Sequence, residues 1–270
     1  MEQHKTLIFQ GRKIHYRDEG RENLGTVVFL HGYMQNLDVW ASYMLSYMHS
    51  KRVIAIDLPG HGFSDNYADV HTMDFMARAV KAVLDDLGVS DCVMVGHSMG
   101  GYVSLAFAEA YPYLMRGLVL LHSHAMADDE QTMQKREEAC KQMASNMPGY
   151  ILSFIQTLFD TQSLRFLSHD IHAVQELALE TSQQGALAAQ KGMLQRPSRL
   201  HVLRSLDAPV LCVYGKNDVR LPVELGISQA LEARNPELLL LSNVAHMAHI
   251  EAREYLKPRL YNFISTCFQG

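Results

Sequence analysis

The chain reads CVMVGHSMG from Cys92 to Gly100, and a helical pattern continues over residues 101–110. The apolar run at its start is typical of a buried strand, and Gly96 and Gly100 flank Ser98 in the pattern G-x-S-x-G. A residue on a sharp turn from strand to helix takes a strained backbone conformation, and only very small neighbours leave room for it. The stretch therefore predicts a strand, a tight turn that carries Ser98, and a helix.

This turn suits Ser98 to act as a nucleophile. It projects the hydroxyl outward and places the backbone N–H of Met99 at a helix N-terminus, where the N–H can stabilise an oxyanion. A glycine-flanked serine in an ordinary turn is the alternative interpretation. The strand before the motif and the helix after it favour the nucleophile, because the five-residue pattern has mechanical meaning in that context.

Strand-like apolar runs alternate with helical patterns along the rest of the chain. That alternation predicts an α/β fold with a mostly parallel, doubly wound sheet and helices on both faces. Residues 6–10 and 13–18, separated by Gly11, are expected to form an antiparallel hairpin. The later strands are expected at residues 26–30, 52–56, 92–95, 117–121, 209–214 and 237–241. The helices are expected at residues 39–48, 72–87, 99–110, 223–233 and 248–268.

Residues 123–196 break this rhythm, since they show helical periodicity, many Met and Gln residues and no convincing strand. We interpret this interval as a helical lid inserted over the carboxyl edge of the sheet. The α/β core would then consist of residues 1–122 and 197–270. A helical bundle that forms a separate domain elsewhere is the alternative.

The composition is that of an ordinary globular protein. Hydrophobic residues make up 48% and charged residues 20% of the 270 residues, which is enough apolar mass for a sizeable core. The formal net charge is −5 and there is no block of Lys or Arg, so neither nucleic acid nor a membrane is an expected partner. No signal peptide or membrane-spanning run is found, and we expect a cytoplasmic protein. The four cysteines are scattered and indicate neither a disulfide framework nor a zinc site.

Five segments together resemble the α/β-hydrolase superfamily, particularly its lidded esterase-like and haloperoxidase-like branch. They are LHGY at 30–33, DLPGHGFS at 57–64, GHSMG at 96–100, GKND at 215–218 and AHMAHIE at 245–251. They follow the family's order and cover nearly the whole chain outside residues 123–196. The resemblance implies the α/β-hydrolase fold with a Ser-His-Asp triad and no cofactor.

In this family the acid and then the histidine follow the nucleophile along the chain. The resemblance therefore assigns Asp218 as the orienting acid and His246 as the general base. Asp128 and Asp129 are rival acids, because related enzymes sometimes supply the acid after the preceding core strand. His249 is the rival base, three residues after His246.

The resemblance also implies an oxyanion hole formed by the backbone N–H groups of Tyr33 and Met99. We expect Met34, His97 and His122 to contact the substrate.

One constellation suggests a metal, namely His122 and His124 followed by Asp128 and Asp129. Two histidines and two carboxylates on one flexible segment are easily found by chance. We therefore expect no metal site.

The function that we expect is a carboxylesterase for small to medium uncharged esters, since Tyr33, Met34 and Met99 are uncharged. Its partner would be a small-molecule ester. A homodimer is possible, because the sequence does not decide the oligomeric state. Fold and triad do not exclude a thioesterase, a perhydrolase, an acyltransferase, a carbon–carbon bond hydrolase or an aminopeptidase. An aminopeptidase would need lid carboxylates, for which Glu176 and Glu180 are the candidates. A ligand receptor that retains the hydrolase scaffold is an alternative of another class.

Overall fold

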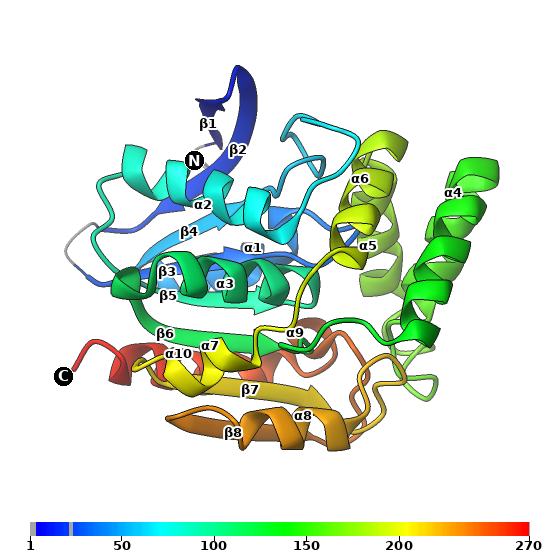
Figure 1. The fold of residues 1–270 in the computed structure, drawn as a ribbon. Helices are drawn as coiled ribbons and strands as arrows, with labels where there is room; N and C mark the ends of the chain where they lie inside the picture. Colours follow the sequence, from blue (N-terminus) through cyan, green and yellow to red (C-terminus); the bar gives the residue numbers. More distant parts are fainter. Residues whose placement is uncertain (1–3, 22–23, 270) are drawn as a thin grey trace.

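The computed structural model describes residues 4–21 and 24–269, whose strands form a single sheet (Figure 1). The strands are β1 (His4–Phe9), β2 (Arg12–Glu19), β3 (Thr26–Leu30), β4 (Arg52–Ile56), β5 (Cys92–His97), β6 (Met115–Leu121), β7 (Val210–Gly215) and β8 (Pro236–Leu241). Their spatial order is β1-β2-β4-β3-β5-β6-β7-β8. β2 pairs antiparallel with β1 and β4, and all the later pairings are parallel. The predicted α/β fold class, with its N-terminal hairpin, is confirmed.

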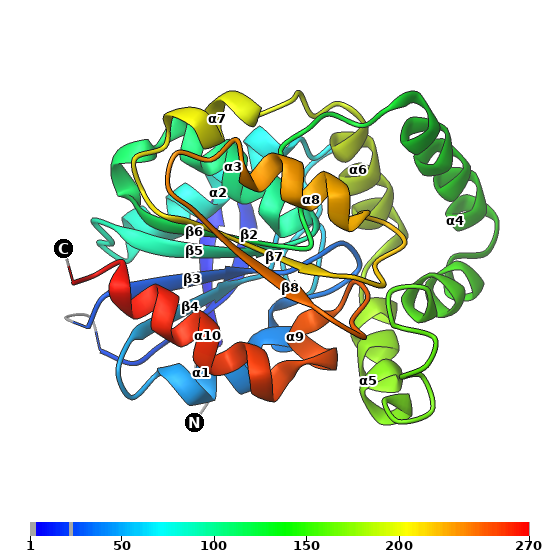
Figure 2. The ribbon, with the colours of Figure 1, turned by 90° about the horizontal axis from the view of Figure 1, so that it is seen from below.

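Helices cover both faces of this sheet (Figure 2). α2 (Met73–Asp86), α3 (Met99–Ala110), α7 (Leu200–Ser205) and α8 (Val223–Ala230) lie on one face, and α1 (Ala41–Tyr47) and α10 (Arg253–Thr266) lie on the other. The buried apolar side chains divide in the same way, with Val28 and Met94 in one cluster and Val27 and Val93 in the other. Successive side chains of a strand point to opposite faces, so each central strand contributes to both clusters.

Two helix ends follow local sequence signals, and one expected helix is interrupted. The side chain of Thr72 caps α2 by accepting the N–H of Phe75, and Gly88 follows the helix with φ +63°. The single helix expected at residues 248–268 was wrong, because a break at Ala252 separates α9 (Ala248–Glu251) from α10. The carboxylate of Glu251, at the end of α9, accepts the backbone N–H groups of Asp160 and Ala245.

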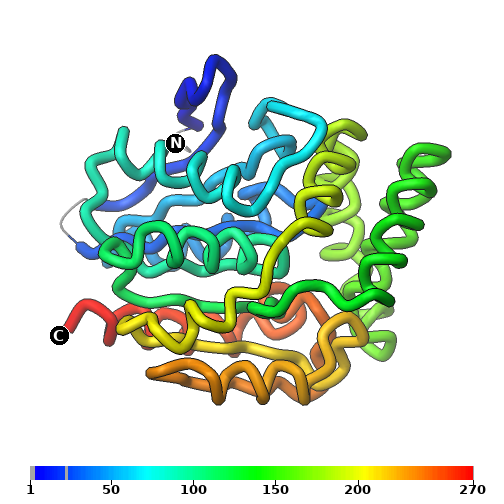
Figure 3. The backbone as a smooth tube through the Cα atoms, viewed as in Figure 1, coloured from blue at the N-terminus to red at the C-terminus, as the bar shows by residue number. Residues whose placement is uncertain are grey.

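Residues 123–196 contain helices and no strand, as the sequence indicated. They are α4 (Glu130–Gln156), α5 (Ser168–Leu179) and α6 (Gln183–Leu194). α4 is kinked at Asn146, two residues before Pro148. Figures 1 and 3 place these helices beyond the carboxyl ends of the parallel strands, where a lid was expected. Within the described parts of the chain, no helix combines the length and apolar character needed to cross a bilayer.

Candidate active site

Ser98 lies on the turn between β5 and α3 in a strained conformation. Its φ is +50° and its ψ is −114°, a combination that residues other than glycine rarely adopt. The N–H of Ser98 donates to the carbonyl of Leu121 at 2.9 Å, and the carbonyl of Ser98 accepts the hydroxyl of Ser123 at 2.8 Å. Bonds to the end of β6 therefore hold the turn in place, with Ser98 half-buried.

Gly96 and Gly100 leave the room that this turn needs. A Cβ at Gly96 would lie 2.5 Å from the carbonyl oxygen of Gly100, and a Cβ at Gly100 would lie 2.4 Å from the carbonyl oxygen of Leu30. Backbone atoms of the sheet and helix cannot move aside by the distance that a methyl group requires. Gly101, which the sequence analysis did not single out, meets the same limit against the side chain of Ser123.

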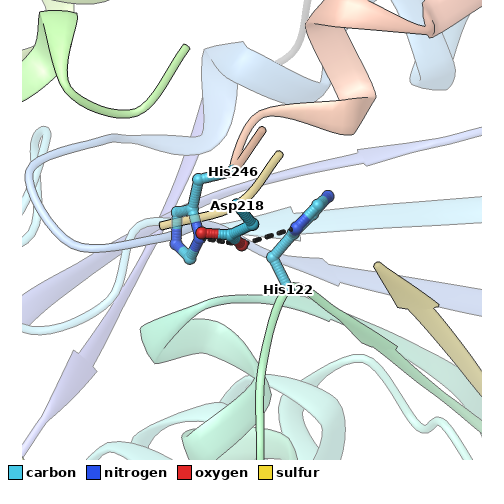
Figure 4. A group of neighbouring side chains, drawn as sticks. All are labelled: His122, Asp218 and His246. Carbon is cyan, nitrogen blue, oxygen red and sulfur yellow. Dashed lines mark hydrogen bonds and ion pairs between the residues drawn. The ribbon is translucent and has the colours of Figure 1, made fainter. Parts of the chain in front are cut away.

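Ser98, His246 and Asp218 form a continuous hydrogen-bonded chain. Nε2 of His246 lies 3.0 Å from Oγ of Ser98. Nδ1 of His246 lies 2.7 Å from Oδ2 of Asp218, and Figure 4 draws this second contact. An ionised carboxylate only accepts hydrogen bonds, so Nδ1 carries the proton and Nε2 is left to accept the serine proton. The side chains of Asp218 and His246 are 0% and 8% exposed, which shields the pair from water.

Four hydrogen bonds keep Asp218 ionised. Oδ1 accepts the backbone N–H groups of Arg220 and Leu221 at 2.9 and 3.2 Å, while Oδ2 accepts His246 and also His122. Burial by itself would raise the pKa of Asp218, but attraction to His246 and the hydrogen bonds from both histidines hold this pKa well below its ordinary value. Asp218 is thus an anion throughout the pH range in which His246 titrates.

The structure corrects the substrate contact expected for His122. Its side chain is 0% exposed, and its Nδ1 lies 2.9 Å from Oδ2 of Asp218 (Figure 4). His122 therefore contacts the acid of the chain and has no surface left for a substrate. No local pattern could indicate this partner, because the two residues are 96 positions apart.

His97 and His249 are also buried beside His246. Nε2 of His97 donates to the carbonyl oxygen of His246 at 2.9 Å, so the expected substrate contact of His97 is corrected to support of the His246 backbone. The ring of His249 packs against His97 and Trp40, with centroids 4.4 and 4.9 Å apart. Burial, with added repulsion from neighbouring histidines, lowers the pKa of His97 and of His249 well below the ordinary value. His246, rather than its rival His249, bonds Ser98.

The rival acids are engaged elsewhere. The side chain of Asp128 is 1% exposed and forms ion pairs with Arg136 at 2.7 Å and Arg196 at 2.8 Å. Asp129 caps the N-terminus of α4. Asp218 is therefore the carboxylate that the fold brings to His246.

The histidines and aspartates that suggested a metal site bond different partners. His122 bonds Asp218, whereas His124 lies against Arg196 at 3.1 Å. Among the described residues, the group with metal-ligand spacing is His122, Asp218 and His246, whose ligand atoms lie within 4.8 Å of one another. Its two histidine atoms are the Nδ1 donors that already bond the carboxylate, so hydrogen bonding accounts for the cluster.

The oxyanion hole expected at the backbone N–H groups of Tyr33 and Met99 stays a prediction. Met99 is the first residue of α3, and we find no hydrogen bond from either N–H in the part of the chain that the structure describes. The side chain of Gln35, which the sequence analysis missed, accepts the N–H of Gly32 at 3.0 Å and holds the loop that carries Tyr33. Met34 has φ +56° and is fully buried, so its expected substrate contact is corrected to core packing.

The segment that follows α4 supplies part of the frame around His246. The N–H of His246 donates to the carbonyl oxygen of Leu158 at 2.9 Å, just after α4. Asp160 accepts the side chain of Asn217 at 3.0 Å, and its N–H donates to Glu251 at 2.7 Å. The segment after α4 is thus bonded to both loops that carry the acid and the base. Sequence motifs could not reveal this, because a backbone acceptor has no side-chain signature.

The burial of His246 predicts a pH dependence for turnover. Burial lowers the pKa of His246 from 6.5, although Asp218 opposes the shift by attracting the imidazolium. A base must be neutral to accept the serine proton, so kcat/KM should rise with pH and reach half its plateau below pH 6.5. A pH series of kcat/KM for an uncharged ester checks this, and a half-maximum above pH 6.5 would contradict it.

Comparison with known proteins agrees with this geometry. The family model described as the alpha/beta hydrolase fold matches residues 25–252. The dihydrolipoyllysine-residue acetyltransferase component of the acetoin cleaving system of Pseudomonas putida is 30% identical over 94% of this chain and 67% of its own length. A 2-hydroxy-6-oxononadienedioate/2-hydroxy-6-oxononatrienedioate hydrolase of Paraburkholderia phymatum is 27% identical, over 93% of this chain and 91% of its own.

Among solved structures, a thermophilic esterase from Thermogutta terrifontis superimposes with a TM-score of 0.91 at 25% identity. The match covers 98% of this chain and 99% of the esterase. The agreement therefore extends over the insertion as well as the sheet. The chain belongs to the α/β-hydrolase fold family and is an enzyme, a hydrolase.

Proposed function

We propose that this hydrolase is a serine carboxylesterase for small to medium esters, with Ser98, His246 and Asp218 as its triad. The observation that carries the proposal is the unbroken chain of hydrogen bonds from the half-buried Ser98 hydroxyl to the ionised carboxylate of Asp218. The esterase of Thermogutta terrifontis supports the reaction class.

The reaction follows from the positions of these groups. Nε2 of His246 takes the proton of Ser98 while Oγ attacks the ester carbonyl, and Asp218 stabilises the imidazolium. The N–H groups of Tyr33 and Met99 stabilise the oxyanion of the tetrahedral intermediate. His246 then protonates the departing alcohol, and water activated by the same imidazole hydrolyses the acyl-enzyme.

The lid carboxylates do not favour an aminopeptidase. Glu180 already accepts the side chain of Asn36 at 2.9 Å, in the loop that follows Tyr33. Glu176 is 63% exposed, with His172 as its neighbour at 3.9 Å. A substrate ammonium group would need a buried, unpaired carboxylate near Ser98, and neither glutamate provides one.

A series of p-nitrophenyl esters tests the proposal. Short and medium acyl chains should be hydrolysed faster than long ones. Aminoacyl p-nitroanilides should be at least about a hundredfold slower in kcat/KM, because neither Glu176 nor Glu180 is a buried, unpaired partner for an ammonium group. Faster cleavage of the anilides would indicate a peptidase. Labelling of Ser98 by a fluorophosphonate without turnover of any ester would indicate a receptor.

The same series tests the charge of the acyl group. An acyl chain that ends in a carboxylate should react more slowly than the neutral chain of equal length, if the substrate is uncharged as proposed. Arg220 makes this a sharp test, because its guanidinium contacts Thr157 and the ring of Phe154 and forms no ion pair with a described carboxylate. If the enzyme preferred the acidic ester and this preference disappeared in Arg220→Gln, the proposal of an uncharged substrate would be wrong.

One relative supports a second candidate, hydrolysis of a carbon–carbon bond. The hydrolase of Paraburkholderia phymatum is named for 2-hydroxy-6-oxononadienedioate, so an unsaturated oxo-diacid belongs in the screen beside the esters.

The cytoplasmic location and the possible homodimer of this protein stay predictions.

A further inference from the structure

We propose that His122 is a positioning residue, a second histidine whose Nδ1–H fixes the carboxylate of Asp218 for His246. The inference rests on the proposed triad and adds a residue to it. His122 does not reach the reacting atoms and would act through Asp218 alone.

The partner of His122 shows which of its ring nitrogens donates. Nδ1 of His122 and Nδ1 of His246 lie 2.9 and 2.7 Å from the same oxygen, Oδ2 of Asp218 (Figure 4). Because a carboxylate only accepts, both rings must carry hydrogen on Nδ1. Nε2 of His122 is buried and has no hydrogen-bond partner among the described residues, which leaves the interaction with Asp218 as the polar role of this ring.

The backbone holds His122 in this orientation at a cost. Its φ is +48°, in the left-handed region that a bulky side chain rarely adopts. The N–H of His122 donates to the carbonyl oxygen of Val213 at 2.9 Å, so the end of β6 is tied to β7. Strain of this kind persists where the surrounding structure fixes the residue, and here it directs the ring at the acid.

A second N–H donor to Oδ2 should lower the basicity of His246. Sharing Oδ2 between two N–H groups withdraws negative charge from the bond to His246, so the imidazolium of His246 gains less from Asp218. The other groups that face His246 are His97 at the end of β5, His249 on α9 and Arg220 after β7. The two histidines are neutral because burial keeps their pKa low, and the positive charge of Arg220 is constant.

Two substitutions separate a polar role from packing. His122→Phe keeps a ring of similar volume and removes the donor. His122→Asn places an amide N–H where Nδ1 lay and tolerates the left-handed backbone better than most residues. His249→Phe is the matched control, because it makes the same change in the same cluster at a ring that does not bond Asp218.

The pH dependence of kcat/KM is the decisive measurement, normalised to the Ser98 that a fluorophosphonate titrates. His122→Phe should raise the half-maximum of the acid limb by about half a pH unit or more and lower the plateau by about tenfold. His122→Asn should restore both towards wild type, and His249→Phe should leave the acid limb in place. Equal profiles for the Phe and Asn variants, or an equal shift in His249→Phe, would overturn the proposal.

Proton NMR provides a readout that does not require turnover. Two downfield Nδ1–H resonances should be visible in the wild type, one lost in His122→Asn and the other in His246→Ala. A single resonance, lost in His246→Ala, would overturn the proposal even if His122→Phe failed to fold. Absence of ester turnover with both resonances present would instead count against the carboxylesterase alone.

Discussion

Replacing Ser98 with alanine should lower kcat for ester hydrolysis by about four to six orders of magnitude, by analogy with removal of the nucleophile from other triads. The loss should be this large because Oγ is the atom that forms the acyl-enzyme, and it is the hydroxyl that Nε2 of His246 bonds among the described residues. Steady-state turnover of a short p-nitrophenyl ester measures the effect. Fluorophosphonate labelling should disappear in the same variant.

Ser104→Ala is the matched control for this substitution. Ser104 lies on α3, the helix that follows Ser98, and is fully buried. Its hydroxyl donates to the carbonyl of Gly100 at 2.7 Å. Its loss should change kcat by no more than about threefold, since a single neutral hydrogen bond contributes little. Substantial residual hydrolysis in Ser98→Ala, with the control active and labelled, would refute Ser98 as the nucleophile.

Asp218→Asn should lower kcat by about ten thousandfold. The side-chain amide has one acceptor oxygen where the carboxylate has two, and its NH2 group can only donate to Nδ1. His246 would therefore no longer be held in the tautomer whose Nε2 accepts the Ser98 proton. The buried charge that stabilises the imidazolium would be lost as well. Turnover at saturating ester, together with circular dichroism to confirm folding, measures this effect.

Asp128→Asn should behave differently although it makes the same chemical change. The side chain of Asp128 is nearly as buried as that of Asp218, at 1% against 0% exposed, but its carboxylate pairs with Arg136 and Arg196. Removing the charge leaves two arginines unbalanced, which should lower the unfolding free energy by about 3 kcal/mol or more. We expect a lower Tm with kcat reduced by no more than about tenfold. A larger loss of kcat than in Asp218→Asn, with folding intact, would reverse the assignment of the acid.

Several parts of the fold were predictable because their causes are local. Alternating apolar runs predicted the β1–β2 hairpin, and Thr72 predicted the start of α2 through a side chain that caps its own helix. The break at Ala252 was not predictable, because residues 248–268 have continuous helical character. At this break the carboxylate of Glu251 bonds the N–H of Asp160, which is 91 positions away in the sequence.

The sequence by itself determined the strand, turn and helix around Ser98, because small residues at Gly96 and Gly100 are a local steric requirement of that turn. Motif order pointed to Asp218 and His246, and it could not choose between Asp128 and Asp218 on physical grounds. Tertiary structure decided that choice, since it alone places one carboxylate beside an imidazole and the other between two arginines.

Tertiary structure also decided the roles of His97, His122 and Leu158. A histidine in a sequence can bind substrate, line a pocket or support another residue, and these roles differ only in what lies within about 3 Å of its nitrogens. His122 reaches Asp218 because the parallel strands β6 and β7 end side by side. The carbonyl of Leu158 reaches His246 because the insertion returns across the same edge. Contacts of this kind depend on the path of the whole chain, which no local pattern records.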